Sequence, residues 1–282
     1  MKKIHFFATA MALFMGLSFT SCLDSDNDTD TLYVGGFVKV SDYMGMYAFK
    51  GPDGKSTINP SSSSITQLEG NGMKLSNVNI AFVQGTYSKE LNPEAEQTQE
   101  YNNVNLSYAA PLDGAVEIVY NEGADNDSIN HACIRSIENI NRGNNFYGNA
   151  FNTPWFFYDK TSLVLPISYA LSAKKHHKFT LVYRHDLSVE GEEEMTLYLR
   201  HYDAKDSSTN YDSFDLASNY PYAYFYAFDL SRAMYDWANA TGRPGDMPDR
   251  ITIKYVADEY STDLKEGEEK SLTVERKPIT LQ

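Results

Sequence analysis

The sequence has few of the features that mark an enzyme, a disulfide-bonded protein or a nucleic-acid-binding protein. Its 282 residues include only two cysteines, and Lys and Arg together number 24 against 38 Asp and Glu. The formal net charge of -14 repels phosphate backbones, which excludes nucleic acid as a partner. Nucleotide-binding glycine loops, the G-x-S-x-G elbow, H-E-x-x-H and C-x-x-C are all missing. We therefore expect no cofactor, no metal site and no catalytic role.

Aromatic residues, in contrast, are abundant. The chain carries 21 Tyr and 15 Phe, and 42% of its residues are hydrophobic. Flat rings pack well on a pleated surface, so this composition favours a sheet-rich globular protein. The length suits two domains of roughly 100 to 200 residues each.

The N-terminus has the pattern of an export signal. Lys2 and Lys3 precede residues 6–19, which contain no charge and no proline. This stretch falls short of the ~20 apolar residues that span a bilayer as a helix, so it predicts a signal peptide. The next residues, 19–22 (Phe-Thr-Ser-Cys), resemble the lipobox of lipoproteins, although Phe19 stands where Leu is usual. We expect residues 1–21 to be removed and Cys22 to become the lipidated first residue.

An acidic tether follows, which we assign to residues 22–31. Its carboxylates occupy alternate positions: Asp24, Asp26, Asp28 and Asp30. Apart from Leu23 the segment has no apolar side chain before Thr31, so it cannot pack into a core. A calcium loop of the EF-hand type is disfavoured, because Thr29 and Gly35 occupy the positions that need Gly and Glu. The acids look instead like the signal that sends lipoproteins of Bacteroidota to the outer face of the outer membrane.

These features predict where in the cell the protein resides. Lipid on Cys22 would hold the protein in the outer membrane, with the folded part facing the cell surface. Cys133 then remains as the second cysteine, and one thiol cannot form an internal disulfide. The fold must therefore rely on its hydrophobic core.

Residues 32–121 predict a small barrel of short strands. Residues 32–40 form a strand pattern that Gly35-Gly36 interrupts, which indicates a bulge or a barrel corner. Residues 46–58 read as a hairpin around Pro-Asp-Gly. Further strands are expected near residues 78–83, 101–108 and 115–120, with polar loops at 60–64 and 90–100 and no helix.

Residues 122–282 predict an antiparallel β-sandwich with one short helix. The segment 121–130 reads as the linker. Residues 179–184 and 195–200 alternate cleanly and form a hairpin, with further strands at 220–228 and 251–256. The helix is expected over residues 232–240, with Asp229 or Ser231 as its cap and Gly242 as its stop.

The order of these pieces resembles the NigD-like family of Bacteroidota lipoproteins. The likeness rests on the lipobox with its Asp-rich tail, the 46–60 hairpin, the 72–82 strand, the 124–129 linker, the strand 197–201 and residues 228–230. The long stretch at 139–152 departs from the family pattern. The resemblance implies an all-β protein with an N-terminal OB-like barrel and a C-terminal sandwich, and an association with bacteriocin loci.

Three sets of residues are candidate sites. Cys133 shares a strand face with His131, yet a small apolar filler is the simpler interpretation. His176 and His177 are expected on opposite faces of a strand, and centring the hairpin near Glu190 sets His201 opposite Phe179, about 20 Å from His185. These pairs cannot share a metal.

The third set is aromatic, and it belongs to the strand at residues 220–228. Its four members share one face of that strand: Tyr222, Tyr224, Tyr226 and Phe228. They read as core rather than as a sugar platform, because the other face is apolar too.

The function that fits is a non-catalytic binding or interaction module with a glycan or protein ligand. Two alternatives stay open. One is an accessory or immunity role in bacteriocin biology, which the family resemblance suggests. The other is polysaccharide binding at the cell surface, and a glycosidase is the weakest candidate because no pair of carboxylates stands out.

Two variants separate anchoring from orientation. Cys22→Ala should abolish labelling by a metabolic fatty acid, because the lipidation site is removed while the apolar signal stays. Replacing the four tether acids with Ala should keep the label but turn the protein inward, so that protease added to intact cells no longer cleaves it. Label retained at the wild-type level in Cys22→Ala would contradict the lipoprotein assignment, and unchanged protease access would show that the acids are only a spacer.

Overall fold

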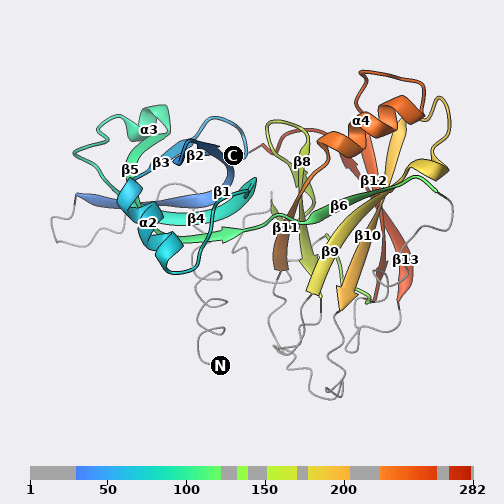
Figure 1. Ribbon diagram of the computed structural model, residues 1–282, viewed down its shortest axis with the longest axis horizontal. Helices are drawn as coiled ribbons and strands as arrows, with labels where there is room; N and C mark the ends of the chain where they lie inside the picture. The colour runs from blue at the N-terminus through green and yellow to red at the C-terminus, as the bar shows by residue number, and fades with distance from the viewer. Residues whose placement is uncertain are drawn as a thin grey trace, which may run out of the picture. The chain divides into compact units, whose positions relative to one another are not determined.

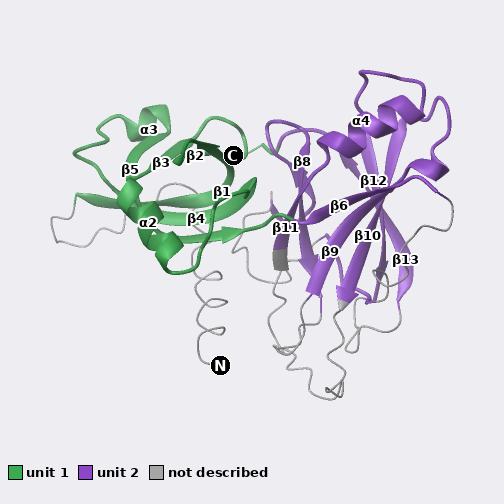
Figure 2. Cartoon of the chain, viewed as in Figure 1, with its two compact units in different colours: residues 1–113, 144–150, 279–282 green, residues 114–143, 151–278 purple. Residues whose placement is uncertain are grey.

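The computed structural model describes residues 30–121, 132–138, 151–169, 177–203, 223–258 and 267–280, and the chain divides into two compact units. Figure 2 shows them in separate colours. The first unit is built on residues 30–113, and the second takes residues 114–138 and 151–278 where these are described. Across the described residues, no helix combines the length and the apolar character that crossing a membrane would require.

The first unit is a closed five-stranded barrel. Its strand order is β1-β2-β3-β5-β4, in which β3 and β5 run parallel and the other pairs antiparallel. The sequence predicts a small barrel here, and this strand order is that of an OB fold, which the family resemblance implies. The elements are β1 (Thr31–Tyr43), β2 (Met46–Lys50), β3 (Thr57–Pro60), α2 (Ser62–Gly70), β4 (Ile80–Ser88), α3 (Ala95–Thr98) and β5 (Glu100–Pro111).

Glycine allows the barrel strands to approach closely. A Cβ on Gly35 would lie 2.6 Å from the carbonyl oxygen of Val83 in β4, so no larger residue fits there. β1 nevertheless pairs with β4 without interruption from Thr31 to Lys39. The bulge expected at Gly35-Gly36 lies instead in β4, where the register with β5 shifts between Gln84 and Gly85.

The expectation of a barrel without helices was wrong. Residues 62–70 form α2, and Ser61 caps it by accepting the backbone N–H of Ser64 at 3.3 Å. Ile65 and Leu68 point into the barrel core, at 8% and 2% exposure. A run of serines predicts a loop because Ser is a weak helix former. Here one of the serines, Ser61, caps the helix, and the burial of Ile65 and Leu68 stabilises it.

The second unit is a sandwich of a five-stranded and a three-stranded sheet. Their orders are β13-β12-β10-β9-β6 and β11-β8-β7, and α4 lies across one end of the strands (Figure 1). The elements are β6 (Ala115–Val119), β7 (Trp155–Phe156), β8 (Ser162–Ser168), β9 (His177–Arg184), η3 (His185–Leu187), β10 (Glu194–Asp203), β11 (Ala223–Asp229), α4 (Ser231–Ala240), β12 (Arg250–Ala257) and β13 (Glu268–Glu275).

The large sheet is mixed rather than purely antiparallel. β10 runs parallel to β12, because the chain crosses through β11 and α4 before it returns to the same sheet. β6 runs parallel to β9, with Ala115 opposite Thr180. Residues 115–119, expected in the barrel, therefore belong to the sandwich; of the described residues, the first unit takes 30–113 and 279–280 and not the expected stretch to 121.

Aromatic and aliphatic side chains from both sheets and from α4 form one core. Phe228 is fully buried, Tyr226 packs against the same cluster, and Trp237 of α4 is 1% exposed. The core assignment of the β11 face is confirmed for Tyr226 and Phe228, while Tyr222 and the side chain of Tyr224 lie outside the described residues.

Truncation of this core has a measurable cost. Phe228→Ala should lower the free energy of unfolding by about 3 to 5 kcal/mol, because it removes a buried ring and leaves a cavity. Tyr235→Ala on α4, where the ring is 63% exposed, is the control and should cost under ~1 kcal/mol. Denaturant melts that gave equal midpoints for both variants would contradict the assignment of Phe228 to the core.

Candidate functional site

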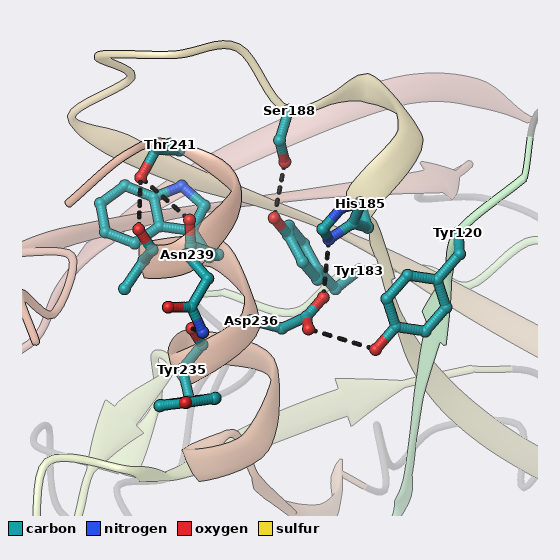
Figure 3. Close-up of polar contacts among 10 residues, drawn as sticks. Tyr120, Tyr183, His185, Ser188, Tyr235, Asp236, Asn239 and Thr241 are labelled. Atoms are coloured by element: carbon teal, nitrogen blue, oxygen red, sulfur yellow. Dashed lines mark hydrogen bonds and ion pairs between the residues drawn. The ribbon is translucent and has the colours of Figure 1, made fainter. Parts of the chain in front are cut away.

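Polar side chains from three elements meet at the α4 end of the second unit. His185 begins η3 directly after β9, Tyr120 follows β6, and Asp236 projects from α4. Figure 3 shows the His185 and Tyr120 side chains converging on the Asp236 carboxylate. We call the three residues the Tyr120–His185–Asp236 cluster.

The Asp236 carboxylate is the centre of the cluster. One oxygen, Oδ2, lies 2.8 Å from His185 Nδ1, and the other, Oδ1, accepts the Tyr120 hydroxyl at 3.1 Å. The rings of Tyr120 and His185 lie 5.0 Å apart. Because a carboxylate accepts, His185 Nδ1 is the donor, and in the neutral imidazole Nε2 carries the lone pair and can accept a hydrogen bond.

The cluster is open to solvent on one side and supported by buried groups on the other. The side chains of His185 and Asp236 are 34% and 19% exposed, and Tyr120 is 49% exposed. Below them, the Tyr183 hydroxyl lies 2.6 Å from Ser188 Oγ. Burial raises the pKa of Tyr183 to about 12 and the charge of Asp236 adds to this, although the hydrogen bond with Ser188 opposes it. Tyr183 therefore stays a neutral phenol.

This arrangement can hold a polar ligand, but it lacks the layout of a nucleophilic site. A Ser–His–Asp triad needs the serine on the imidazole, whereas Ser188 bonds with Tyr183. The Tyr120 hydroxyl is engaged by the carboxylate. Within the described ranges, no group of three His, Cys, Asp or Glu side chains is placed to hold a metal ion.

A second histidine cluster lies buried at the other end of the β9–β10 hairpin. His177 Nδ1 and His201 Nε2 are 2.8 Å apart, and the His201 ring stacks on Phe179 at 4.3 Å. Tyr169 packs against both imidazoles and shares a 3.1 Å hydrogen bond with the Tyr226 hydroxyl. Burial, followed by the charge of His177, lowers the pKa of His201 to about 3, and the backbone of Cys133 and Ala132 opposes this shift.

The structure places the predicted histidines only in part as expected. His201 is paired with Phe179 in the hairpin register, which confirms the predicted alignment and keeps His201 away from His185. The contact between His177 and His201 was missed. The same register sets Asp203 opposite His177, so His177 and His201 are diagonal neighbours, and this could have been found from the alignment.

The other predicted residues fall into two groups. Cys133 is 1% exposed, as expected of a small filler, and His131 lies outside the described residues. The described residues also do not include Cys22, Asp24, Asp26 and Asp28. Asp30 is exposed, and its backbone carbonyl accepts the N–H of Lys89 at 2.7 Å, which ties the start of the barrel to the end of β4.

Sequence signals did not identify the Tyr120–His185–Asp236 cluster. Its members are 65 and 51 residues apart, and none belongs to a motif. A partial clue was available, since Asp236 is a charged residue between the buried Met234 and Trp237 of a predicted helix. Only the packing of α4 beside η3 and β6 shows what this carboxylate contacts.

Three of the solved structures to which this chain is similar come from Bacteroides species. One is a candidate lipoprotein from Bacteroides fragilis, with a TM-score of 0.62 and 19% identity over 88% of this chain and 99% of that one. A protein of unknown function from Bacteroides vulgatus has a TM-score of 0.48 and 11% identity, over 88% and 92% of the two chains. A NigD-like immunity protein from Bacteroides caccae has a TM-score of 0.46 and 12% identity, over 89% and 99%.

No protein-family profile and no curated protein sequence matches the chain. The Bacteroides fragilis structure shows, at 19% identity, that the fold is shared.

Acid should destabilise the second unit through His201. Its pKa is about 3 in the folded chain against an ordinary 6.5, so the unfolded chain binds one more proton between these pH values. The contribution of neutral His201 to the free energy of unfolding is therefore complete above pH 6.5 and is lost as the pH falls toward 3. The free energy of unfolding should decrease by up to about 1.4 kcal/mol per pH unit from this group.

Denaturant melts between pH 7.5 and pH 5 measure this dependence. In His201→Gln the slope should be shallower than in the wild type, while His185→Gln, at a partly exposed site, serves as the control. Equal slopes in His201→Gln and the wild type would rule out a buried neutral His201.

Proposed function

We propose that the protein is a lipid-anchored binding protein of the outer membrane that acts without catalysis. The observation that carries this proposal is the order of the chain: an apolar signal, Cys22 in a lipobox context and four alternating acids lead directly to Asp30, where the folded barrel begins. The similar fold of a candidate lipoprotein supports the same assignment. The acids support an orientation toward the cell surface.

We further propose that the Tyr120–His185–Asp236 cluster is the ligand contact and that the ligand is a glycan. Tyr120 offers a partly exposed ring, and rings of this kind pack on the apolar faces of sugars. His185 Nε2 and the partly exposed carboxylate of Asp236 offer acceptors for sugar hydroxyls. An aromatic surface beside a few oriented polar groups is the usual composition of a small-ligand site.

The absence of turnover follows from the way the polar groups are used. Asp236 makes one hydrogen bond through each oxygen, to Tyr120 and to His185, and Ser188 bonds with Tyr183, so these groups hold each other in place. A glycosidase would need two carboxyl groups about 5 to 10 Å apart with a raised pKa on one of them. The cluster contributes one carboxylate, which favours binding over hydrolysis.

Glycan arrays probed with residues 23–282 test this function. Tyr120→Ala and Asp236→Asn should each weaken binding by about 10-fold or more, equivalent to ~1.4 kcal/mol. Tyr235→Ala, on a different side of α4 in Figure 3, is the matched control and should bind like the wild type. The melting temperature of each variant shows whether it folds.

Two outcomes would contradict the proposal. If wild-type protein binds no glycan, the bacteriocin-associated role implied by the family resemblance becomes the better account. If the bound glycan is cleaved, the assignment as a non-catalytic protein is wrong.

A further inference from the structure

The β1–β2 hairpin extends beyond the barrel. β1 pairs with β4 only as far as Lys39, opposite Ile80, whereas its pairing with β2 continues to Tyr43, opposite Met46. The final residues of β1 and the first of β2 thus form a two-stranded ribbon whose outer edge is not held by β4. The sequence motifs do not account for this extension.

The turn of the ribbon is well defined and carries exposed apolar side chains. Met44 and Gly45 both have positive φ, at 53° and 80°, and Asp42 Oδ1 accepts the N–H of Gly45 at 2.9 Å. Tyr43, Met44 and Met46 are 67%, 87% and 66% exposed. We call these three side chains the hairpin tip.

Methionine is an unusual choice at such a position. Two positive φ angles in a row favour Asn, Asp or Gly, which adopt this conformation at little cost and prefer water. Met44 bears the conformational strain and exposes its side chain to solvent as well. Strain of this kind that persists without a packing role indicates that the side chain has a function.

We propose that the hairpin tip inserts into the outer leaflet of the membrane that holds the lipid anchor. This proposal builds on the lipidation of Cys22 and adds a second contact, which fixes how the barrel lies on the bilayer. The acyl chains supply the attachment itself, and the second contact restricts the orientation of the barrel on the bilayer. Exposed Tyr and Met suit the boundary between acyl chains and headgroups.

The chain lengths are compatible with both contacts. The tether of nine residues, 22–30, reaches at most about 30 Å when extended. β1 has 13 residues and spans roughly 40 Å, with the tether at one end and the hairpin tip at the other. A barrel that lies with β1 along the bilayer therefore brings the tip and the anchor to the same surface.

The charges behind the tip fit a headgroup layer. Lys39 and Lys50 are paired opposite each other, four residues back from Tyr43 in β1. Because side chains alternate between the two faces of a strand, this pair lies on the same face of the ribbon as the Tyr43–Met46 pair. With β1 along the bilayer, that face presents the two ammonium groups to the lipid phosphates, to which they are attracted. This pairing favours a lipid surface over a protein partner.

The test uses a tether that does not depend on lipidation. The mature chain carries a polyhistidine tag in place of Cys22 and is held on vesicles of phosphatidylcholine and phosphatidylglycerol by a nickel-chelating lipid. Met44→Cys then provides the reactive thiol for an environment-sensitive fluorophore, because Cys133 is buried. Nitroxide-labelled lipids report whether the fluorophore reaches the acyl chains.

We expect several-fold stronger quenching at position 44 than at Leu91→Cys, a control site that is 63% exposed in the β4–β5 connection. Adding Tyr43→Ser and Met46→Ser to the position-44 probe should reduce the quenching to the control level. Equal quenching at 44 and 91 in the unmodified hairpin would overturn the proposal and favour a protein partner for the tip. Loss of fatty-acid labelling at Cys22 in cells is a separate outcome and concerns the anchor alone.

Discussion

The burial of α4 against the sandwich is the constraint on which the candidate site depends. Met234 and Trp237 lie in the core at 0% and 1% exposure, and this fixes the rotation of the helix about its own axis. Asp236, between them, then has to face η3 and β6. A short helix has little stability of its own in water, so its packing decides where the carboxylate points.

His185 and His201 differ in their chemistry because they lie in different environments of the same fold. His185 sits where a strand leaves the sheet, keeps part of its surface in water and binds a carboxylate. His201 is enclosed by Phe179, Tyr169 and a second imidazole, and burial disfavours its charged form. The first is suited to contact a ligand. The second is a neutral core group that makes the fold sensitive to acid.

The barrel and the sandwich carry different parts of the proposed function. In the barrel, Gly35 and Gly85 let the strands pack closely enough to close a small core, and the hairpin tip extends past the point where β4 stops pairing. In the sandwich, the crossover through β11 and α4 makes β10 and β12 parallel and places the helix over one end. We propose membrane contact for the first unit and ligand contact for the second.

The fold class could be predicted from the sequence because strand patterning is local. The alternation at residues 179–184 and 195–200 determined not only the hairpin but its register, with His201 opposite Phe179. The Pro-Asp-Gly hairpin and the end of α4 before Gly242 were likewise given by residues near in sequence, whereas Leu230, rather than Asp229 or Ser231, is the N-cap of α4. The lipobox-like residues and the acids that follow remain predictions, which the sequence offers because signals of this kind act on the linear chain.

Tertiary structure alone decided which strands share a sheet and which polar groups meet. β6 has strand character wherever it lies, and only its pairing with β9 assigns it to the sandwich. Helix α2 is stabilised by burying Ile65 and Leu68, a contribution that a run of serines does not reveal. Tyr120, His185 and Asp236 become a cluster through packing between distant segments, and such packing leaves no spacing in the sequence from which it could be read.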